Sequence, residues 1–141
     1  MEDEEKREYI QNLAVEAETY QKRGQELQNQ MQSLQMAEME MQKTIEALKN
    51  LKENGTALFS LGSGVFVSGE LKNTNKILVN IGSNVLVEKD IDSTLKFIGE
   101  REKEVDEAKK ELLKAMQVIS GRLREIDVEA RKLIGREKGE R

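Results

Sequence analysis

The chain has 141 residues, of which 37% are hydrophobic, 4% aromatic and 35% charged. This apolar content is low for a thick globular core but sufficient for the narrow seam of a two-helix coiled coil, so we expect an elongated architecture. Cysteine and histidine are absent, which removes disulfides, thiolate nucleophiles, imidazole bases and the usual zinc or haem ligands. We therefore expect no enzyme activity, no catalytic residue, no cofactor and no metal site.

The formal net charge of −4 offers no basic surface for phosphates, so nucleic acid is not an expected partner. No stretch contains the 18 or more apolar residues of a membrane span, and the acidic beginning of the sequence differs from a signal peptide. We therefore predict no membrane contact and a cytoplasmic location.

Residues 1–53 are predicted to form one long helix. From residue 4 to residue 52 there is no proline and a single glycine. Apolar residues recur at alternating steps of three and four, which is the a and d pattern of a coiled coil. Asn54 and Gly55 are predicted to end the helix, because glycine takes the left-handed conformation without steric cost. The a and d series is Ile10, Leu13, Ala17, Tyr20, Gly24, Leu27, Met31, Leu34, Glu38, Met41, Ile45 and Leu48.

Residues 54–90 alternate apolar and β-branched residues with polar ones, which predicts four short strands. The predicted strands are Thr56–Leu61, Val65–Leu71, Lys76–Ile81 and Val85–Lys89. The segment LGSGVFV, which starts at Leu61, recurs twenty residues later as IGSNVLV, so we interpret the region as two tandem β-hairpins. The glycine-rich segment at residues 62–64 is interpreted as a hairpin turn, because a dinucleotide-binding loop needs a third glycine and a following helix.

Four short strands cannot bury both of their faces, and open strand edges normally pair with further strands. We therefore predict that the hairpins associate with other subunits, in a closed β-barrel or ring built from several copies. The candidate residues for this oligomerisation are Leu58, Phe59, Leu61, Val65, Phe66, Val67, Leu71, Ile77, Leu78, Val79, Ile81, Val85, Leu86 and Val87.

Residues 91–141 are predicted to form a second helix that begins at Asp90 or Asp92, whose carboxylates can accept the free N–H groups of a first turn. Neither helix can leave its apolar stripe in water, so the two helices are expected to pair antiparallel, with paired residue numbers summing to roughly 144. The a and d series of the second helix is Ile91, Leu95, Ile98, Glu102, Val105, Lys109, Leu112, Met116, Ile119, Leu123, Ile126, Ala130 and Leu133.

Two groups of residues in the helices leave alternatives open. Glu38, Glu102 and Lys109 interrupt the apolar seam, and they either fix its register or extend outward to solvent. Met36 and Met39 lie off the seam, where they are expected to face a neighbour or a partner.

Apolar residues near the free ends of the two helices form a second candidate surface. Frayed helix ends give little cover, so these residues are expected to be partly exposed and to bind apolar segments of other proteins. The alternative is that they pack against one another as an ordinary end of the helix pair. The candidate residues are Tyr9, Ile10, Leu13, Val128, Leu133 and Ile134.

The order helix, two hairpins, helix, with LGSGVFVSGE in the first hairpin and IGSNVLVEKDIDSTLKFI leading into the second helix, resembles the α-class subunit of archaeal prefoldin. The resemblance covers the whole chain. It implies a chaperone that works without ATP, in which hairpins of α-class and β-class subunits form a β-barrel platform. It also implies that the coiled-coil tips hold non-native polypeptides and pass them to a group II chaperonin.

Two alternatives to that function remain open. The resemblance implies a hexamer of two α-class and four β-class subunits, but prefoldin-like α-class chains include a type that assembles with identical copies into filaments. Interface symmetry decides between the closed hexamer and the filament. The chain could instead be a structural coiled-coil spacer that binds no unfolded protein.

Overall fold

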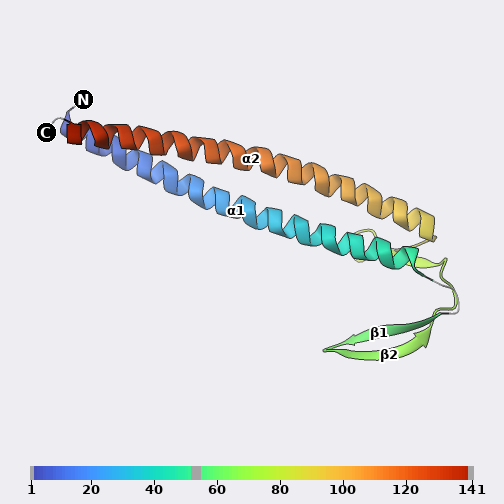
Figure 1. The fold of residues 1–141 in the computed structure, drawn as a ribbon. Coiled ribbons are helices and arrows are strands. Elements are labelled where there is room, and N and C mark those ends of the chain that lie inside the picture. The colour runs from blue at the N-terminus through green and yellow to red at the C-terminus, as the bar shows by residue number, and fades with distance from the viewer. Residues whose placement is uncertain (1, 52–54, 140–141) are drawn as a thin grey trace. The chain divides into compact units, whose positions relative to one another are not determined.

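The computed structural model describes residues 2–51 and 55–139 (Figure 1). The chain consists of helix α1 (Asp3–Lys49), strands β1 (Thr56–Gly62), β2 (Val65–Glu70), β3 (Ile77–Asn80) and β4 (Leu86–Lys89), and helix α2 (Ile91–Gly139). It divides into two compact units: residues 1–35 with 106–141, and residues 36–105. The expected fold class, two long helices joined by two hairpins, is confirmed, while the intersubunit barrel stays a prediction.

In the first unit, α1 and α2 run antiparallel. Ascending positions on α1 meet descending positions on α2: Tyr9 bonds to Glu129, Glu16 pairs with Arg122, and Gly24 lies beside Ile119. In the second unit, Gln42 Nε2 donates to Glu102 Oε2 at 2.7 Å, and the residue numbers of this pair sum to 144 as predicted. Glu102, one of the three polar residues that interrupt the apolar seam, therefore bonds across to α1.

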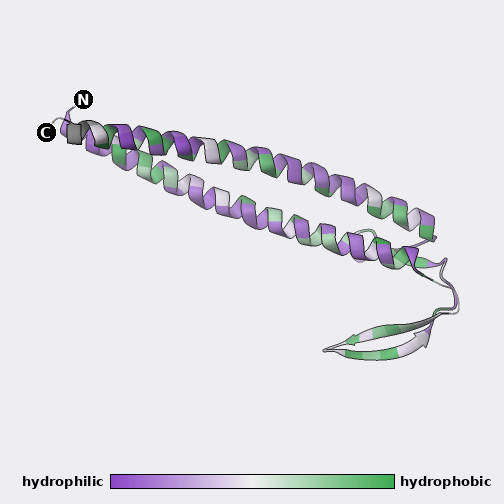
Figure 2. Ribbon diagram, in the orientation of Figure 1, coloured by the Kyte–Doolittle hydropathy of each residue, from purple (hydrophilic) through white to green (hydrophobic). Residues whose placement is uncertain are grey.

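Every position of both predicted a and d series is buried or half-buried. The buried hydrophobic residues, such as Leu27 and Ile126, all belong to these series. Burying a leucine or isoleucine fully contributes about 1.5–3 kcal/mol, so the seam supplies the main stabilisation of each helix. Hydrophobic residues recur along both helices in Figure 2. Met36 and Met39, which lie off the seam, are exposed.

The helix ends differ slightly from the prediction. Three acidic residues occupy the first turn of α1 and Lys49 its last turn, which suits the helix dipole. The predicted end at Asn54 lies outside the described residues, and α1 ends at Lys49. At the start of α2, Asp90 Oδ1 accepts the backbone N–H of Ser93 at 2.7 Å. Asp90 is therefore the N-cap, and Asp92 lies within the first turn.

The two hairpins share one local structure, as the repeat predicts. Strands β1 and β2 pair antiparallel, as do β3 and β4. Each turn contains three consecutive residues with positive φ: 99°, 52° and 77° at residues 62–64, and 126°, 50° and 60° at residues 82–84. Ser60 Oγ accepts the N–H of Gly62, and Asn80 Oδ1 accepts the N–H of Gly82, exactly twenty residues apart in both partners. Glycine or asparagine, which tolerate positive φ, occupies the first and third positions of each turn, and a serine occupies the middle one.

Two further findings concern the part of the chain that the structure describes. Neither helix there contains an apolar stretch long enough to cross a membrane. No group of three or more carboxylates there could hold a metal ion.

Candidate assembly surface and helix-tip surface

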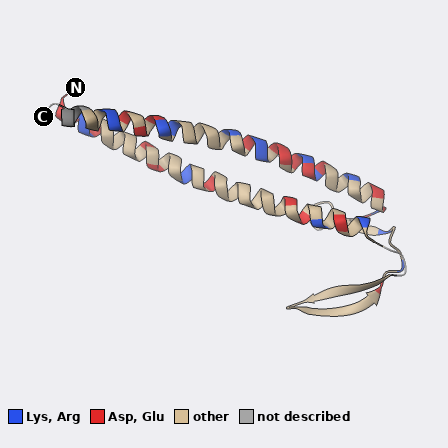
Figure 3. Ribbon diagram, viewed as in Figure 1, with Lys and Arg blue, Asp and Glu red and all other residues tan. Residues whose placement is uncertain are grey.

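The first hairpin, β1 and β2, carries a large exposed apolar surface. We call it the first-hairpin surface, and it consists of Leu58, Phe59, Leu61, Val65, Phe66 and Val67, all of which are exposed. The sequence from residue 55 to residue 69 contains no charged side chain, and β1 and β2 are almost entirely free of charge in Figure 3. Charged side chains on an exposed strand oppose its association with other proteins. An exposed apolar surface that lacks such charges is typical of an interface.

Both faces of this hairpin are apolar. Phe59 is paired with Val67, so these two side chains share one face, while Phe66 is paired with Ser60 and lies on the other face. The ring of Phe59 also covers Gly69, where an added Cβ would lie 2.6 Å from Phe59 Cε2. One partner surface on one face would therefore leave apolar side chains of the other face in water.

The second hairpin, β3 and β4, differs from the first because one face is partly covered. Ile77, Val79 and Val87 are half-buried and share a face, since Val79 pairs with Val87. Leu71, between the hairpins, is also half-buried. The remaining predicted assembly residues of this hairpin are exposed: Leu78, Ile81, Val85 and Leu86.

A contact that sequence reasoning missed holds the second hairpin to α2. The Arg101 guanidinium lies 4.4 Å from the centroid of the Phe97 ring, and Arg101 Nη2 donates to the backbone O of Asn80 at 3.3 Å. Lys89 Nζ lies 5.6 Å from the same ring. The two cations thus connect β3 and β4 to one aromatic ring of α2. We call this set, Lys89, Phe97, Arg101 and Asn80, the hairpin anchor.

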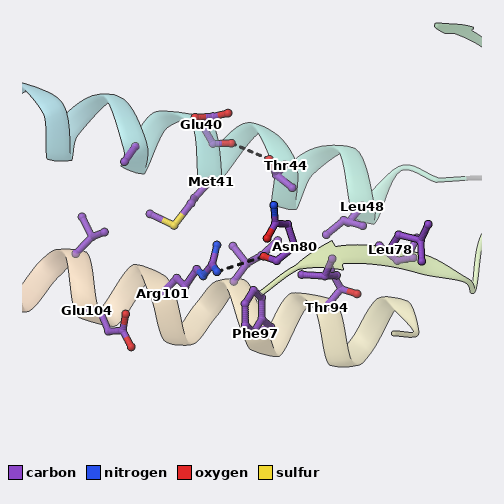
Figure 4. A pocket seen from close by; sticks show the side chains of 15 residues that line it. Glu40, Met41, Thr44, Leu48, Leu78, Asn80, Thr94, Phe97, Arg101 and Glu104 are labelled. Carbon is purple, nitrogen blue, oxygen red and sulfur yellow. Dashed lines mark hydrogen bonds between the residues drawn. The ribbon is translucent and has the colours of Figure 1, made fainter. Parts of the chain in front are cut away.

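An apolar groove of about 580 Å³ lies between α1, β3 and α2 in the second unit (Figure 4). Its apolar lining includes Met41, Leu48, Leu78, Phe97 and Ile98. Figure 4 shows Arg101 reaching from α2 toward Asn80 on β3, so the hairpin anchor fixes one wall of the groove.

The predicted helix-tip residues do not form one uniform surface. Tyr9, Val128 and Ile134 are exposed, and Ile10 and Leu133 are half-buried. Leu13 is only 4% exposed, so the prediction of partial exposure is wrong for Leu13. This residue occupies a d position, and the seam covers it although it lies near the end of the helix. We call the other five residues the tip surface.

Polar contacts across the helices adjoin the tip surface. Arg122 Nε and Nη2 donate to the two carboxylate oxygens of Glu16 at 2.8 and 3.1 Å. Arg122 Nη1 also donates to Glu125 on its own helix at 3.1 Å. These bonds raise the pKa of Arg122 further above its usual range. The Tyr9 hydroxyl donates to Glu129, and this bond raises the pKa of Tyr9. The pattern in Figure 3 places acidic and basic residues on both helices here.

Comparison with known proteins now identifies the family. The family model described as "Prefoldin subunit" matches residues 20–136, which include both hairpins, the a and d series of α2 and that of α1 from Tyr20 onward. The chain belongs to the prefoldin family. The resemblance inferred from the sequence is thereby confirmed.

Several curated relatives of this prefoldin chain are archaeal proteins named prefoldin subunit alpha. The one from Archaeoglobus fulgidus is 33% identical over 123 residues, covering 85% of this chain and 90% of the relative. The one from Pyrococcus horikoshii is 31% identical over 121 residues, covering 83% and 82%. Other alignments are shorter: the chain covers 61% of the relative from Methanococcus maripaludis strain C5 and 48% of that from Methanococcus vannielii.

Two solved structures share the fold. The prefoldin beta subunit from Thermococcus strain KS-1 has a TM-score of 0.61 and 14% identity, covering 88% of this chain and 90% of that one. Filamentous PFD from Methanocaldococcus jannaschii, solved by cryo-electron microscopy, has a TM-score of 0.53 and 21% identity, covering 86% and 98%. At these identities the likeness establishes the prefoldin fold alone.

Proposed function

We propose that this chain is a subunit of a prefoldin chaperone that binds non-native polypeptides without ATP. The observation that carries the proposal is the first-hairpin surface, which is apolar on both faces, uncharged and exposed, in a chain of the prefoldin family. Such a surface is costly in water, and assembly with other prefoldin subunits removes it from solvent. The partners are β-class subunits or identical copies.

The native mass of the purified chain tests assembly. The chain is measured alone and again after mixing with a β-class subunit, by sedimentation. We expect a complex larger than a monomer in the mixture, because the hairpins of both classes cover one another. A chain that stays monomeric in both samples, with its hairpins folded, would contradict the proposal.

The tip surface is the proposed site for non-native polypeptides, which are then passed to a group II chaperonin. Its exposed apolar members lie among charged residues, which suits reversible binding of exposed apolar segments. The test is suppression of aggregation of a denatured model protein, without nucleotide, by a chain carrying Val128→Asp and Ile134→Asp. We expect suppression to fall several-fold, whereas Val118→Asp, at a more exposed position of α2 outside the tip surface, leaves it unchanged.

Two results of that experiment would separate the alternatives. Equal suppression by the tip variant and the control would remove the tip surface from client binding, and no suppression by any form would favour the structural spacer. Binding of the client-loaded chain to a group II chaperonin is a separate measurement, and its failure would end only the transfer step.

A second candidate function is assembly of identical copies into a filament. The specific observation in its favour is the fold shared with filamentous PFD. If the hairpin of one copy contacts a different surface of the next copy, the contact can repeat and a filament grows. A two-fold symmetric contact is complete after two copies and closes. Electron microscopy of the chain alone decides: filaments support this candidate, and discrete particles that form only with β-class subunits exclude it. A cytoplasmic location stays a prediction.

A further inference from the structure

Methionine is the only sulfur-containing residue of this chain, because cysteine is absent. In a chain without thiols, the thioether of methionine is the group that peroxides oxidise most readily. Four of the six methionines lie within eleven residues of α1, at positions 31, 36, 39 and 41. These four side chains do not share one environment, so oxidation has different consequences at different positions.

Exposure divides the methionines of the two helices into two groups. The exposed fraction is 71% for Met36 and 61% for Met39, but only 8% for Met31. Met41 and Met116 are half-buried, and like Met31 they belong to the a and d series of the seam. Because oxidation of a thioether depends on access, a peroxide reaches Met36 and Met39 first.

The residue four positions earlier in the same helix separates the same two groups. Side chains at this spacing are neighbours on a helix. Gln32 precedes Met36 and Gln35 precedes Met39, and both glutamines are exposed. A glutamine amide can donate to an oxygen atom on a neighbouring sulfur, whereas an alkyl side chain cannot. The three methionines of the seam are preceded at this spacing by apolar residues only: Leu27, Ala37 and Leu112.

We propose that Met36 and Met39, each with its glutamine one turn earlier, form a site of reversible oxidation to methionine sulfoxide that the helix pair tolerates. Hydrogen peroxide is the oxidant: its O–O bond breaks, an S–O bond forms with a lone pair of the sulfur, and water leaves. A methionine sulfoxide reductase restores the thioether, and two thiols supply the electrons and become a disulfide. The inference is independent of the proposed function.

The position of the methionine determines how much oxidation destabilises the helix pair. A sulfoxide at Met36 or Met39 lies in water, and its oxygen accepts a hydrogen bond from Gln32 or Gln35. The same group at Met31 would place a polar oxygen in the apolar seam, without a donor, which strongly opposes pairing of the helices. The chain therefore takes up oxidant at its two exposed methionines before the seam is damaged.

Limited treatment of the full-length chain with hydrogen peroxide, followed by peptide mass spectrometry, tests the site. We expect Met36 and Met39 to be oxidised roughly five- to tenfold faster than Met31, in line with exposed fractions of 71% and 61% against 8%. Helical circular dichroism should stay unchanged until Met31 reacts, and sulfoxide reductases should return the chain to its original mass. Equal rates at the three residues, or loss of helix after oxidation of Met36 and Met39 alone, would overturn the proposal.

A chain carrying Gln32→Leu and Gln35→Leu tests the part that the glutamines play. Its thermal midpoint is measured before and after limited oxidation, so that each unoxidised chain is its own reference. We expect oxidation to lower the midpoint of this variant more than that of the wild type, because its sulfoxides have lost their donors. Gln25→Leu with Gln28→Leu is the matched control, since no methionine lies four residues after either position. An equal fall in the variant and the wild type would overturn the assignment of the glutamines to the site.

Discussion

Arg122 contributes to the helix pair mainly through geometry. Its planar guanidinium binds both oxygens of Glu16 on the other helix, which only one axial alignment of the helices permits. An apolar seam alone accepts a shift by one heptad, because leucine, isoleucine and methionine replace one another at small cost. The ion pair therefore adds register specificity to the end of the first unit that carries the tip surface.

A double-mutant cycle on Glu16→Gln and Arg122→Gln measures this contribution. We expect each substitution to lower the thermal midpoint slightly and the double variant to lose less than the sum, because the two side chains interact. The coupling should shrink at 1 M salt, since both side chains are partly exposed and screened. Arg23→Gln, whose partner Glu26 lies on the same helix, is the control. A coupling no larger than in the Arg23–Glu26 cycle would remove the role in register.

Asp90 gives a pH-dependent contribution at the start of α2. The bond from the Ser93 N–H lowers the pKa of Asp90 below its usual 3.8. A lowered folded-state pKa means that the stabilisation is complete above the unfolded value and is lost as pH falls through the folded value. We expect Asp90→Asn, which keeps an acceptor but does not titrate, to lose less stability than the wild type between pH 4 and pH 2. Denaturant unfolding followed by circular dichroism measures the difference, and parallel curves would contradict it.

At the scale of elements, the features that depend on local sequence pattern could be predicted from the sequence. The heptads located both helices, the twenty-residue repeat located both hairpins, and glycine and asparagine located the turns with positive φ. Leu13 shows which signal is stronger: the d position predicted burial, whereas proximity to the helix end predicted exposure, and the seam prevailed.

The differing environments of the two hairpins could not be predicted from the sequence. The repeat makes them equivalent, but only the second has Phe97 and Arg101 beside it. These residues are four apart on α2 and off the seam, so an aromatic residue with an arginine one turn later was the available signal. Nothing in their spacing identifies Asn80 on β3 as the partner, because that contact depends on tertiary structure.

Gly24 tests how far the seam tolerates change. An added Cβ at Gly24 would lie 3.7 Å from Ile119 Cγ2, which is an ordinary contact. Gly24→Ala should therefore stabilise the chain by about 0.5–1 kcal/mol, because alanine loses less backbone entropy in a helix. Gly69→Ala is the contrasting variant, since its Cβ would meet the Phe59 ring at 2.6 Å and displace it. Urea unfolding measures both, and destabilisation by Gly24→Ala would show that the seam there needs glycine.

At the scale of the whole molecule, the stability of the helices and the burial of the first hairpin depend on different contacts, whereas a globular domain achieves both with one core. The helices are stabilised by their own seam, while the first hairpin has apolar residues on both faces and no cover among the described residues. Folding of the helices therefore does not depend on assembly, but burial of the hairpin does. Substitutions in the hairpin should therefore change assembly without changing the folding of the helices.

Phe66→Asp makes that separation measurable. Phe66 belongs to the first-hairpin surface and is 58% exposed in the single chain, so an aspartate there is solvated in a free subunit and buried only in an assembly. We expect helical circular dichroism to stay unchanged while sedimentation shifts toward free subunits. Val15→Asp, on α1 with 63% exposure, should change neither quantity. An unchanged sedimentation profile for Phe66→Asp would mean that the hairpin stays in water in the assembled protein, which its composition makes costly.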